Sequence, residues 1–461
     1  MNISKFYSEK TINSMRYGIV PVSNISYLTV GRDEIIECYK NGFEIAKRGT
    51  GKNLIIEGQF GMGKSHILNY SKYLAVKNNF VISTVTIDQT LLFNKMDKAL
   101  NEILDSIELP DLPSINGFER ILQEIFRTNK KHDLLNWCND NYSSSHIENK
   151  LKIGIKAYYN IINNTKSKET ADEIIRWILC EKVEVKRIKD ILRWNVPEAR
   201  NVSSLKFVQD EIIDLIKSIT QLFRSIGYSG WLILIDECEN FFELSSSFKS
   251  RMKIFSNLDQ LINGLENIFI IFTITPGQLD KIYDYFKTYL PDSNYKIPQF
   301  LYKTRGKYLK ILKQLNKEDY KKLSKTIIHF YETAYLNKNF FDKKHEKFLE
   351  RFFILAETEG LPTRIVIKTI IEVLDYLSTY SEQTESLLDS EFILTNSVVT
   401  ETNNIDIGDY LRHDIFGACK VVDIKIANDD RIIVTVEILK SNELKSFVPE
   451  HAKFKKIEMT V

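Results

Sequence analysis

An eight-residue, glycine-rich run between a strand-like and a helix-like segment restricts the fold of this chain more than any other feature. The run is GQFGMGKS, from Gly58 to Ser65, and it fits the pattern G-x-x-x-x-G-K-[S/T]. The apolar segment LIIEG precedes it at 54–58, and SHILNYSKYLAVKNN continues from it with helical periodicity. A second apolar run, FVISTVTID at 80–88, completes a strand, loop, helix and strand unit, which predicts a parallel crossover.

The residues of this run are those that a phosphate-binding loop needs. Glycine tolerates positive φ and a close backbone approach, so successive N–H groups can point at phosphate oxygens at the positive end of the helix. Lys64 is predicted to neutralise the β and γ phosphates, and the Ser65 hydroxyl to bind Mg²⁺. The predicted nucleotide-binding residues of the loop are Gly58, Gln59, Phe60, Gly61, Met62, Gly63, Lys64 and Ser65.

Length and composition predict a folded protein with more than one structural unit. One packed core rarely exceeds about 300 residues, and this chain has 461. Hydrophobic residues make up 43% and charged residues 27%, which is the balance of a globular protein. The net charge of +2 gives no whole-chain signal for nucleic acid or membrane binding, so any basic surface must be local.

Targeting and redox signals favour a cytoplasmic protein. The N-terminal sequence lacks the apolar run and cleavage site of a secretory signal, so export is not expected. The most apolar stretches, WLILI at 231–235 and IFIIFTIT at 268–275, are far too short to cross a bilayer, so no membrane partner is expected. Five cysteines lie far apart without a CxxC pair, which argues against a zinc site and a disulfide framework.

Hydrophobic periodicity predicts an α/β core followed by helices. Residues 1–300 are expected to form the core, with a helical insertion at about 91–228 that shows no strong strand candidate. The sheet is expected to end near Thr275, and residues 301–380 are expected to form an α-helical lid.

The C-terminal part is predicted to be separate. Residues 381–404 are rich in Ser, Thr, Glu and Asn and are interpreted as a linker. Residues 405–461 are expected to form a small all-β unit, because two alternating runs flank the turn-prone residues 428–430.

Two carboxylates follow the apolar run at 231–235. Asp236 and Glu237 stand where a parallel strand presents its carboxyl end to a ligand crevice. Asp236 is predicted to hold Mg²⁺, and Glu237 to polarise the water that attacks the γ-phosphate. Two acids after a strand are often a solvated loop, but the upstream phosphate loop favours the catalytic interpretation. Glu239 and Glu243 are weaker candidates.

Four further residues could sense the γ-phosphate. Thr275 ends the run at 268–275 at the same predicted sheet edge, and Thr273 lies deeper; an ordinary strand role is an equal alternative for both. Arg305 lies in a basic run, which usually means a solvated face, although its guanidinium could reach a phosphate in its own or a neighbouring subunit. Arg364 stands in the first turn of a predicted helix, where an anionic ligand or a surface salt bridge could explain a cation.

Taken in order, these segments resemble an AAA+-type P-loop ATPase, with GQFGMGKS as the phosphate loop, LIDE as the acids, FTITP as the sensor strand and LPTR as the lid arginine. VGRDEI at 30–35 resembles the segment before the first strand in initiator-like members, where a Gly-Arg pair lies near the adenine. This implies nucleotide contacts for Gly31 and Arg32. The implied fold is an α/β P-loop NTPase (AAA+/ASCE-like), with ATP and Mg²⁺ as cofactors.

A narrower resemblance is to the BREX-system ATP-binding domain family of bacterial phage-defence proteins, over about residues 20–380. The shared features are a Gly-Arg helix, G-x-[F/Y]-G-x-G-K-[S/T]-H, a long helical insertion and GYSGWLILIDE, from Gly227 to Glu237. The motif adds His66 to the loop, although its default interpretation is a packing or helix-surface residue. The resemblance implies defence against foreign DNA within a multi-protein system.

The segment IDIGDYLRHDIFGACKVVDI, at 405–424, resembles the Tudor-like (SH3-type) β-barrel at the C-terminus of UvrD/PcrA-type DNA helicases. The matching residues are Gly408, Asp409, His413, Phe416 and Gly417, whereas Ala418 and Cys419 depart from the pattern. In the helicases this module contacts other proteins. Residues 405–461 contain nine Lys/Arg and ten Asp/Glu, a poor balance for binding phosphates, so a protein partner is expected, with packing on the core as the equal alternative.

Two functions are consistent with these features. The first is an ATPase, which converts ATP and water to ADP and phosphate, of an anti-phage system; it would couple hydrolysis to DNA remodelling or to control of a helicase or nuclease. The second is an ATP-gated switch or adaptor that oligomerises and recruits partners through its barrel, with only slow hydrolysis. A nucleotide kinase is disfavoured, because no compact acceptor-binding lid with clustered arginines is evident. A homo-oligomer is expected, and direct DNA binding is left open.

Overall fold

The structure of this chain is a computed structural model. It describes residues 4–140, 145–165, 167–179, 181, 183–197, 211–263, 265–289, 297–303, 308–335, 341, 343–379, 410–413, 417–426, 432–438, 443–447 and 454–456. The chain divides into two compact units, Met1–Ala334 with Ala356–Arg364, and Tyr335–Leu355 with Ile365–Val461. Within the described ranges, every helix is too short or too polar to cross a membrane.

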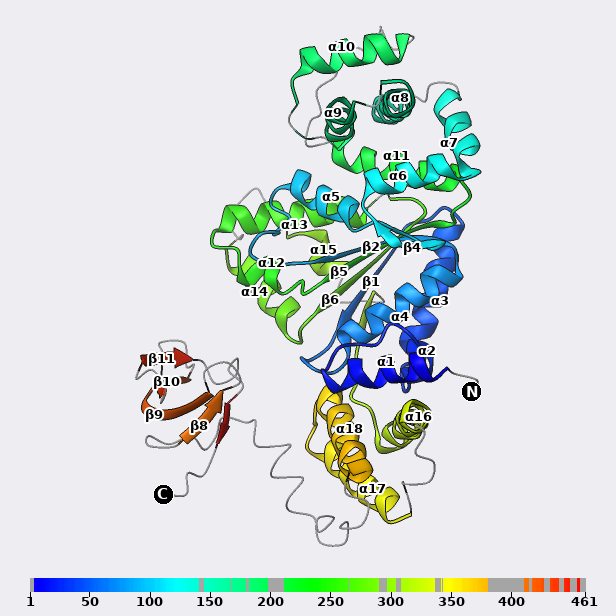
Figure 1. Cartoon of the computed structure of the whole chain (residues 1–461). Coiled ribbons are helices and arrows are strands. Elements are labelled where there is room, and N and C mark those ends of the chain that lie inside the picture. The colour runs from blue at the N-terminus through cyan, green and yellow to red at the C-terminus, as the bar shows by residue number, and fades with distance from the viewer. Residues whose placement is uncertain are drawn as a thin grey trace. The chain divides into compact units, whose positions relative to one another are not determined.

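A seven-stranded, mainly parallel sheet forms the centre of the first unit (Figure 1). Its strand order is β4-β3-β2-β5-β6-β1-β7. The pairs β2–β5, β5–β6, β6–β1 and β1–β7 are parallel, whereas β3 and β4 add antiparallel beside β2. The strands are β1 (Lys52–Glu57), β2 (Phe80–Thr86), β3 (Glu108–Leu109), β4 (Leu112–Asn116), β5 (Gly230–Asp236), β6 (Ile268–Ile274) and β7 (Leu309–Ile311).

Two expectations about this sheet are wrong. The segment at 91–228 contributes β3 and β4, although no strong strand candidate was expected there. The sheet also continues beyond Thr275, because β7 pairs with β1 and forms its edge. β3 has two residues and β7 has three, and so short a strand leaves no alternating pattern in the sequence.

Helices cover both faces of the sheet because alternate strand residues are apolar on both sides. Leu54 and Ile56 of β1 pack with α3 (Asp33–Lys47) and α4 (Lys64–Lys77) in one buried cluster. Ile55 belongs to a second buried cluster, which contains α5 and α13. Figure 1 shows α3 and α4 on one side of the sheet and α5 and α13 on the other. The continuous apolar strands therefore have the doubly covered environment that their sequence predicts.

Most of the described chain between β2 and β5 is helical. The longest helix of this segment, α8, packs against α7, α9, α10 and α11. The helices are α5 (Met96–Asp105), α6 (Phe118–Arg127), α7 (Lys130–Asn139), α8 (His146–Asn160) with a π-helical turn at Ile161–Thr165, α9 (Lys168–Ile178), α10 (Val185–Asn195) and α11 (Ile212–Ser225).

The remaining helices precede β1 or follow β5. Before α3 stand α1 (Lys5–Arg16) and α2 (Ile25–Leu28). After β5 come α12 (Asn240–Glu243), α13 (Phe248–Ile262), α14 (Gln278–Tyr289), α15 (Gln299–Lys303), α16 (Lys317–Tyr335), α17 (Lys343–Thr358) and α18 (Thr363–Thr379). An α-helical lid at 301–380 stays a prediction, and that span also contains β7.

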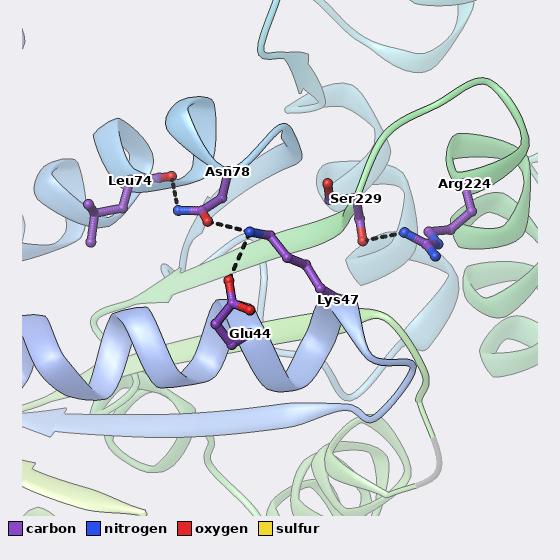
Figure 2. A network of polar contacts seen from close by, with 6 residues as sticks. All are labelled: Glu44, Lys47, Leu74, Asn78, Arg224 and Ser229. Carbon is purple, nitrogen blue, oxygen red and sulfur yellow. Dashed lines mark hydrogen bonds and ion pairs between the residues drawn. The ribbon is translucent and has the colours of Figure 1, made fainter.

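Polar contacts join the C-terminal ends of α3 and α4, at the edge of the sheet opposite the glycine-rich run (Figure 2). Lys47 Nζ donates to Glu44 Oε1 at 2.9 Å and to Asn78 Oδ1 at 2.7 Å. Asn78 Nδ2 donates to the Leu74 carbonyl at 2.8 Å, which caps a terminal carbonyl of α4. Such partly exposed pairs stabilise by about 1 kcal/mol or less, so they orient these helices more than they stabilise the fold.

The second unit contains a separate antiparallel sheet with the order β11-β10-β9-β8-β12. β9 and β10 pair antiparallel as the hairpin prediction requires, although the turn residues 428–430 lie outside the described residues. β11 and β12 stand at the two ends of this order, so a closed barrel is not shown by the described strands. The strands are β8 (Tyr410–His413), β9 (Gly417–Ile426), β10 (Ile432–Ile438), β11 (Glu443–Phe447) and β12 (Phe454–Lys456).

The resemblance of this tail to the helicase module stays a prediction. His413 of β8 pairs with Gly417 of β9. The other matching residues, Gly408, Asp409 and Phe416, lie outside the described residues, as does the linker at 381–404.

A buried chain of hydrogen bonds connects β5, β2 and α5. Trp231 Nε1 donates to Ser83 Oγ at 3.0 Å, and the Ser83 hydroxyl donates to the Ile103 carbonyl at 2.7 Å. The side chains of Trp231 and Ser83 are both fully buried. Because no solvent can replace a lost partner there, this small serine satisfies two buried polar groups at once.

We predict that Ser83→Ala lowers the free energy of unfolding by about 1–3 kcal/mol, because it leaves the indole N–H without its acceptor. Chemical denaturation measures this change. Trp231→Phe removes the donor, so Ser83→Ala should cost less in that background. Equal costs in both backgrounds would contradict the prediction.

Candidate functional site

The glycine-rich loop lies between β1 and α4, where the sequence pattern places it. Gly61 has φ 77° and Gly63 has φ 100°, which is the left-handed region that favours glycine. A Cβ at Gly61 would also lie 2.8 Å from Pro362 Cβ. Both positions therefore require glycine, and the loop folds back toward the N-terminus of α4.

The first turn of α4 offers an electropositive environment. Lys64 and Ser65 begin the helix, and no acidic residue stands in that turn. Lys64 Nζ donates to the Gly58 carbonyl at 2.8 Å, and Ser65 is exposed. The unpaired N–H groups of a helix N-terminus and its dipole favour an anion such as phosphate.

Three other loop residues have different environments. Gln59 and Phe60 are exposed, and the Phe60 side chain is 78% exposed. Met62 is buried and packs with α3 and α4 in the hydrophobic cluster on that face of the sheet. Met62 therefore anchors the loop, whereas Gln59 and Phe60 project from it.

The Arg32 side chain supports the loop through hydrogen bonds to backbone carbonyls. Its side chain is only 8% exposed, and Arg32 Nη2 donates to the Met62 carbonyl at 3.2 Å. Arg32 Nη1 donates to the Lys313 carbonyl, after β7. Burial lowers the pKa of Arg32, while Tyr320 and Asp319 act in the opposite direction. Arg32 thus positions the loop, and its predicted contact with adenine stays a prediction.

Gly31 precedes Arg32 in the chain, and His66 lies near the Arg32 side chain. A Cβ at Gly31, whose φ is 63°, would collide with the carboxylate of Asp319. His66 Nε2 lies 2.9 Å from Thr29 Oγ1, and the Thr29 hydroxyl donates to the Ile25 carbonyl at 2.8 Å. The hydroxyl has one hydrogen, so a neutral His66 donates from Nε2 to Thr29. His66 therefore joins α4 to the segment before α3.

Asp236 ends β5, and the neighbouring strand β6 holds its side chain. The Thr273 hydroxyl donates to Asp236 Oδ1, and the backbone N–H of Glu237 donates to the same oxygen at 3.0 Å. Within the described residues these hydrogen bonds reach only Oδ1, so Oδ2 is the oxygen that a ligand could use. Thr273, the deeper threonine, is thus the one that contacts the acid.

Glu237 occupies a strained turn. It is exposed and has φ 59°, a conformation that costs a non-glycine residue about 1 kcal/mol or more. Glu237 Oε2 lies 3.4 Å from Asn240 Nδ2, which also donates to the Ile87 carbonyl at 2.7 Å. The turn thereby keeps this carboxylate at the surface beside Asn240.

Glu239 links the loop after β5 to the loop after β6. Glu239 Oε2 accepts a hydrogen bond from the Thr275 backbone N–H at 3.3 Å. Burial raises the pKa of Glu239, and the Lys64 ammonium acts in the opposite direction. Glu243, one turn further on, accepts a hydrogen bond from Gln278 at 2.6 Å. Both residues ranked as weaker candidates in the sequence, yet they organise this edge of the sheet.

Of the two predicted arginines, the structure describes only Arg364. Arg364 begins α18 as expected, is exposed, and donates its backbone N–H to the Gly61 carbonyl at 3.1 Å. Its guanidinium lies against Gly18, where an added Cβ would meet Arg364 Nε at 2.7 Å. Arg364 is therefore next to the phosphate loop, although a phosphate contact stays a prediction. Arg305 lies outside the described residues.

The strand order brings the loop and the acids to one edge of the sheet. β6 lies between β1 and β5 and is parallel to both, so the ends of all three strands point the same way. Among the described residues, no group of three or more His, Cys, Asp and Glu side chains could hold a metal ion. Oxygens of Ser65 and Asp236 could serve as ligands of Mg²⁺, an ion that usually binds through one or two carboxylates and keeps water or phosphate oxygens as its other ligands.

The sequence carries signals that could have identified Thr273 and Glu239 as residues that organise this site. Thr273 stands two positions before Thr275, on the same face of a strand, so its hydroxyl could reach the neighbouring strand. Glu239 is the third acid in a run of four residues, which marks a dense acidic turn. Neither pattern states which hydroxyl contacts Asp236 or which acid contacts Thr275.

The model of a protein family described as BREX system ATP-binding protein BrxC/D matches residues 3–390 of the chain. A search of curated protein sequences finds no match.

We predict that His66 makes folding stability depend on pH. Burial and the nearby Arg32 lower the pKa of His66 to about 4, from a usual value of 6.5. Between these values the unfolded chain binds the proton and the folded chain does not, so stability rises with pH from about 4 to 6.5 and is complete above it. The effect is about 3 kcal/mol at its limit.

The measurement is chemical denaturation across that pH range. His66→Gln keeps a donor for Thr29 and should remove this part of the pH dependence. His132→Gln, at an exposed histidine of α7, is the matched control and should leave it unchanged. An unaltered pH dependence in His66→Gln would refute the assignment.

Proposed function

We propose, from the premise that this chain belongs to the family of BREX system ATP-binding proteins BrxC/D, that it binds ATP at the glycine-rich loop and hydrolyses it. One observation carries the proposal. The loop with Gly61 and Gly63 in left-handed conformations lies at the same sheet edge as Asp236, with one parallel strand between them. In open parallel sheets, ligands bind outside the carboxyl ends of the strands.

Phosphate binding follows from the loop's chemistry. The backbone N–H groups from Gly61 to Ser65 and the positive end of α4 would face the phosphates. Lys64 would release the Gly58 carbonyl and neutralise phosphate oxygens, since a charged acceptor forms the stronger hydrogen bond. Arg32 would keep the loop in place through the Met62 carbonyl.

The acidic residues have separate proposed tasks. Bound Mg²⁺ would neutralise charge on the phosphates. Ser65 and Asp236 would provide its protein oxygens, and Thr273 would keep Asp236 oriented. Glu237 would polarise the attacking water after turning away from Asn240, and Thr275 would contact the water or the γ-phosphate. Arg305 and Arg364 are proposed to reach the γ-phosphate from a neighbouring subunit or from the same one.

Glu239 interacts electrostatically with Lys64 and accepts a hydrogen bond from the Thr275 backbone N–H. A γ-phosphate would compete with Glu239 for the same ammonium. We therefore propose that binding of ATP changes the contact between Glu239 and the loop after β6, which would couple nucleotide binding to that loop.

The biological role is proposed to be anti-phage defence within a multi-protein system, with ATP hydrolysis controlling a helicase or nuclease or remodelling DNA. A homo-oligomer is part of this proposal, and the C-terminal all-β unit is the proposed contact for a protein partner. Cytoplasmic localisation stays a prediction.

A second candidate function is an ATP-gated switch with slow hydrolysis. Its support is the position of Glu237, which has φ 59° and lies beside Asn240. If the carboxylate leaves this position rarely, ATP would persist and hold an assembled state that recruits partners. The two functions differ in the response of turnover to DNA.

We predict that Lys64→Ala abolishes ATP binding, whereas Glu237→Gln binds ATP and turns it over about 100-fold or more slowly. Binding is measured by calorimetry, and turnover by phosphate release with and without DNA. Glu237→Gln should also retain an assembled state in ATP, seen as a higher mass. Turnover that DNA stimulates favours the enzyme, and slow turnover insensitive to DNA favours the switch.

Two matched controls lie far from the proposed site. Lys77→Ala changes an exposed lysine at the other end of α4, and Glu266→Gln changes an exposed acid before β6. Both should bind and hydrolyse ATP like the unmodified chain. Full turnover in Glu237→Gln would show that another group activates the water.

A further inference from the structure

Helix α10 presents a polar, basic face away from the rest of the helical segment. Its apolar residues Ile188, Ile191 and Leu192 are buried, and the helix packs against α8 and α9. Figure 1 shows α10 beyond these two helices, at the end of the segment remote from the sheet. In the part of the chain that the structure describes, the opposite face of α10 is exposed.

Three cations on this face are exposed, namely Lys186, Lys189 and Arg193. The exposed Asp190 lies among them, so the face carries three cations and one acid. No acidic side chain of the described residues forms a salt bridge with them. Arg187 differs, because it pairs with Glu169 at 2.9 Å and with Glu173 at 2.5 Å. The chain carries a net charge of only +2, so the excess of cations on α10 is a local feature. Such a stripe suits an anionic partner.

Trp194 follows this stripe directly and is 82% exposed. The other tryptophans, Trp137, Trp177 and Trp231, are 8%, 1% and 0% exposed. A large aromatic side chain normally buries most of its area, so an exposed indole beside cations marks a contact surface.

We propose that the exposed face of α10, formed by Lys186, Lys189, Arg193 and Trp194, binds single-stranded nucleic acid. The cations would contact phosphates, and the indole would stack on a base. Unpaired bases offer their faces for stacking, whereas a duplex keeps them inside. An acidic protein would use the cations but gives the indole no such role. The inference is independent of the proposed ATPase, because no nucleotide site takes part.

Tryptophan fluorescence of the full chain tests this surface directly. Acrylamide reaches exposed indoles, so its quenching reports on Trp194 rather than on the three buried tryptophans. A single-stranded deoxythymidine oligonucleotide, added at low salt without ATP, should shield Trp194 from acrylamide. Trp194→Ala should weaken binding of a labelled oligonucleotide about tenfold, which lies within the range measured for one stacked base.

Charge reversal tests the cations separately. Lys189→Glu with Arg193→Glu should reduce the slope of log affinity against log salt by about 1.4, because two phosphate contacts are lost. The matched control is Lys322→Glu with Lys325→Glu, two exposed lysines on α16, which should leave the slope unchanged. Thermal unfolding of each variant checks that the fold is retained.

Three results would overturn the proposal. The first is no shielding of Trp194 by the oligonucleotide in the unmodified chain. The second is equal affinity for duplex DNA with Trp194 still open to acrylamide, which would mean charge attraction without stacking. The third is shielding by polyglutamate as strong as by the oligonucleotide, which would identify an acidic protein as the partner. Loss of ATP binding in Lys64→Ala, with oligonucleotide binding retained, would separate this surface from the nucleotide site.

Discussion

The parallel pairing of β1, β6 and β5 is the constraint on which the site depends. β1 ends in the glycine-rich loop, and β5 ends in Asp236. Because β6 pairs with both in parallel, these two ends must emerge on one side of the sheet. The Thr273 contact with Asp236 and the Glu239 contact with Thr275 then tie the ends of β5 and β6 together. The site is thus a consequence of sheet topology, refined by a few hydrogen bonds.

A second group of contacts connects the loop and α4 to the segment before β1. Arg32 reaches the Met62 carbonyl from the N-terminus of α3, and His66 reaches Thr29. These contacts attach the segment before β1 to the glycine-rich loop and to the start of α4. They are partly or fully buried, so each loses little strength to water. A loop that is already held in place needs little reordering on binding a ligand, and such preorganisation strengthens binding.

The sequence predicts those parts of the structure where a long pattern or a demanding chemistry leaves a trace. The apolar runs of β2, β5 and β6 and the loop from Gly58 to Ser65 are such cases. β3 and β7 are too short to leave a pattern in the sequence. Pairing with β2 and β4 determines β3, and pairing with β1 determines β7. The buried position of Arg32, against Met62 and Lys313, depends on segments far apart in the chain, so no local pattern reveals it. The contact between Glu239 and Thr275 likewise arises from the turn after β5, not from residue type.

The loop and Asp236 are proposed to enclose a triphosphate and its divalent ion together. The most direct measurement is calorimetric titration of the full chain with ATP, with and without Mg²⁺, for the unmodified chain and for Asp236→Asn. We expect Mg²⁺ to strengthen ATP binding in the unmodified chain, and Asp236→Asn to lose this gain while it still binds ATP. No uptake of ATP by the unmodified chain, or the same gain from Mg²⁺ in both proteins, would contradict the proposal.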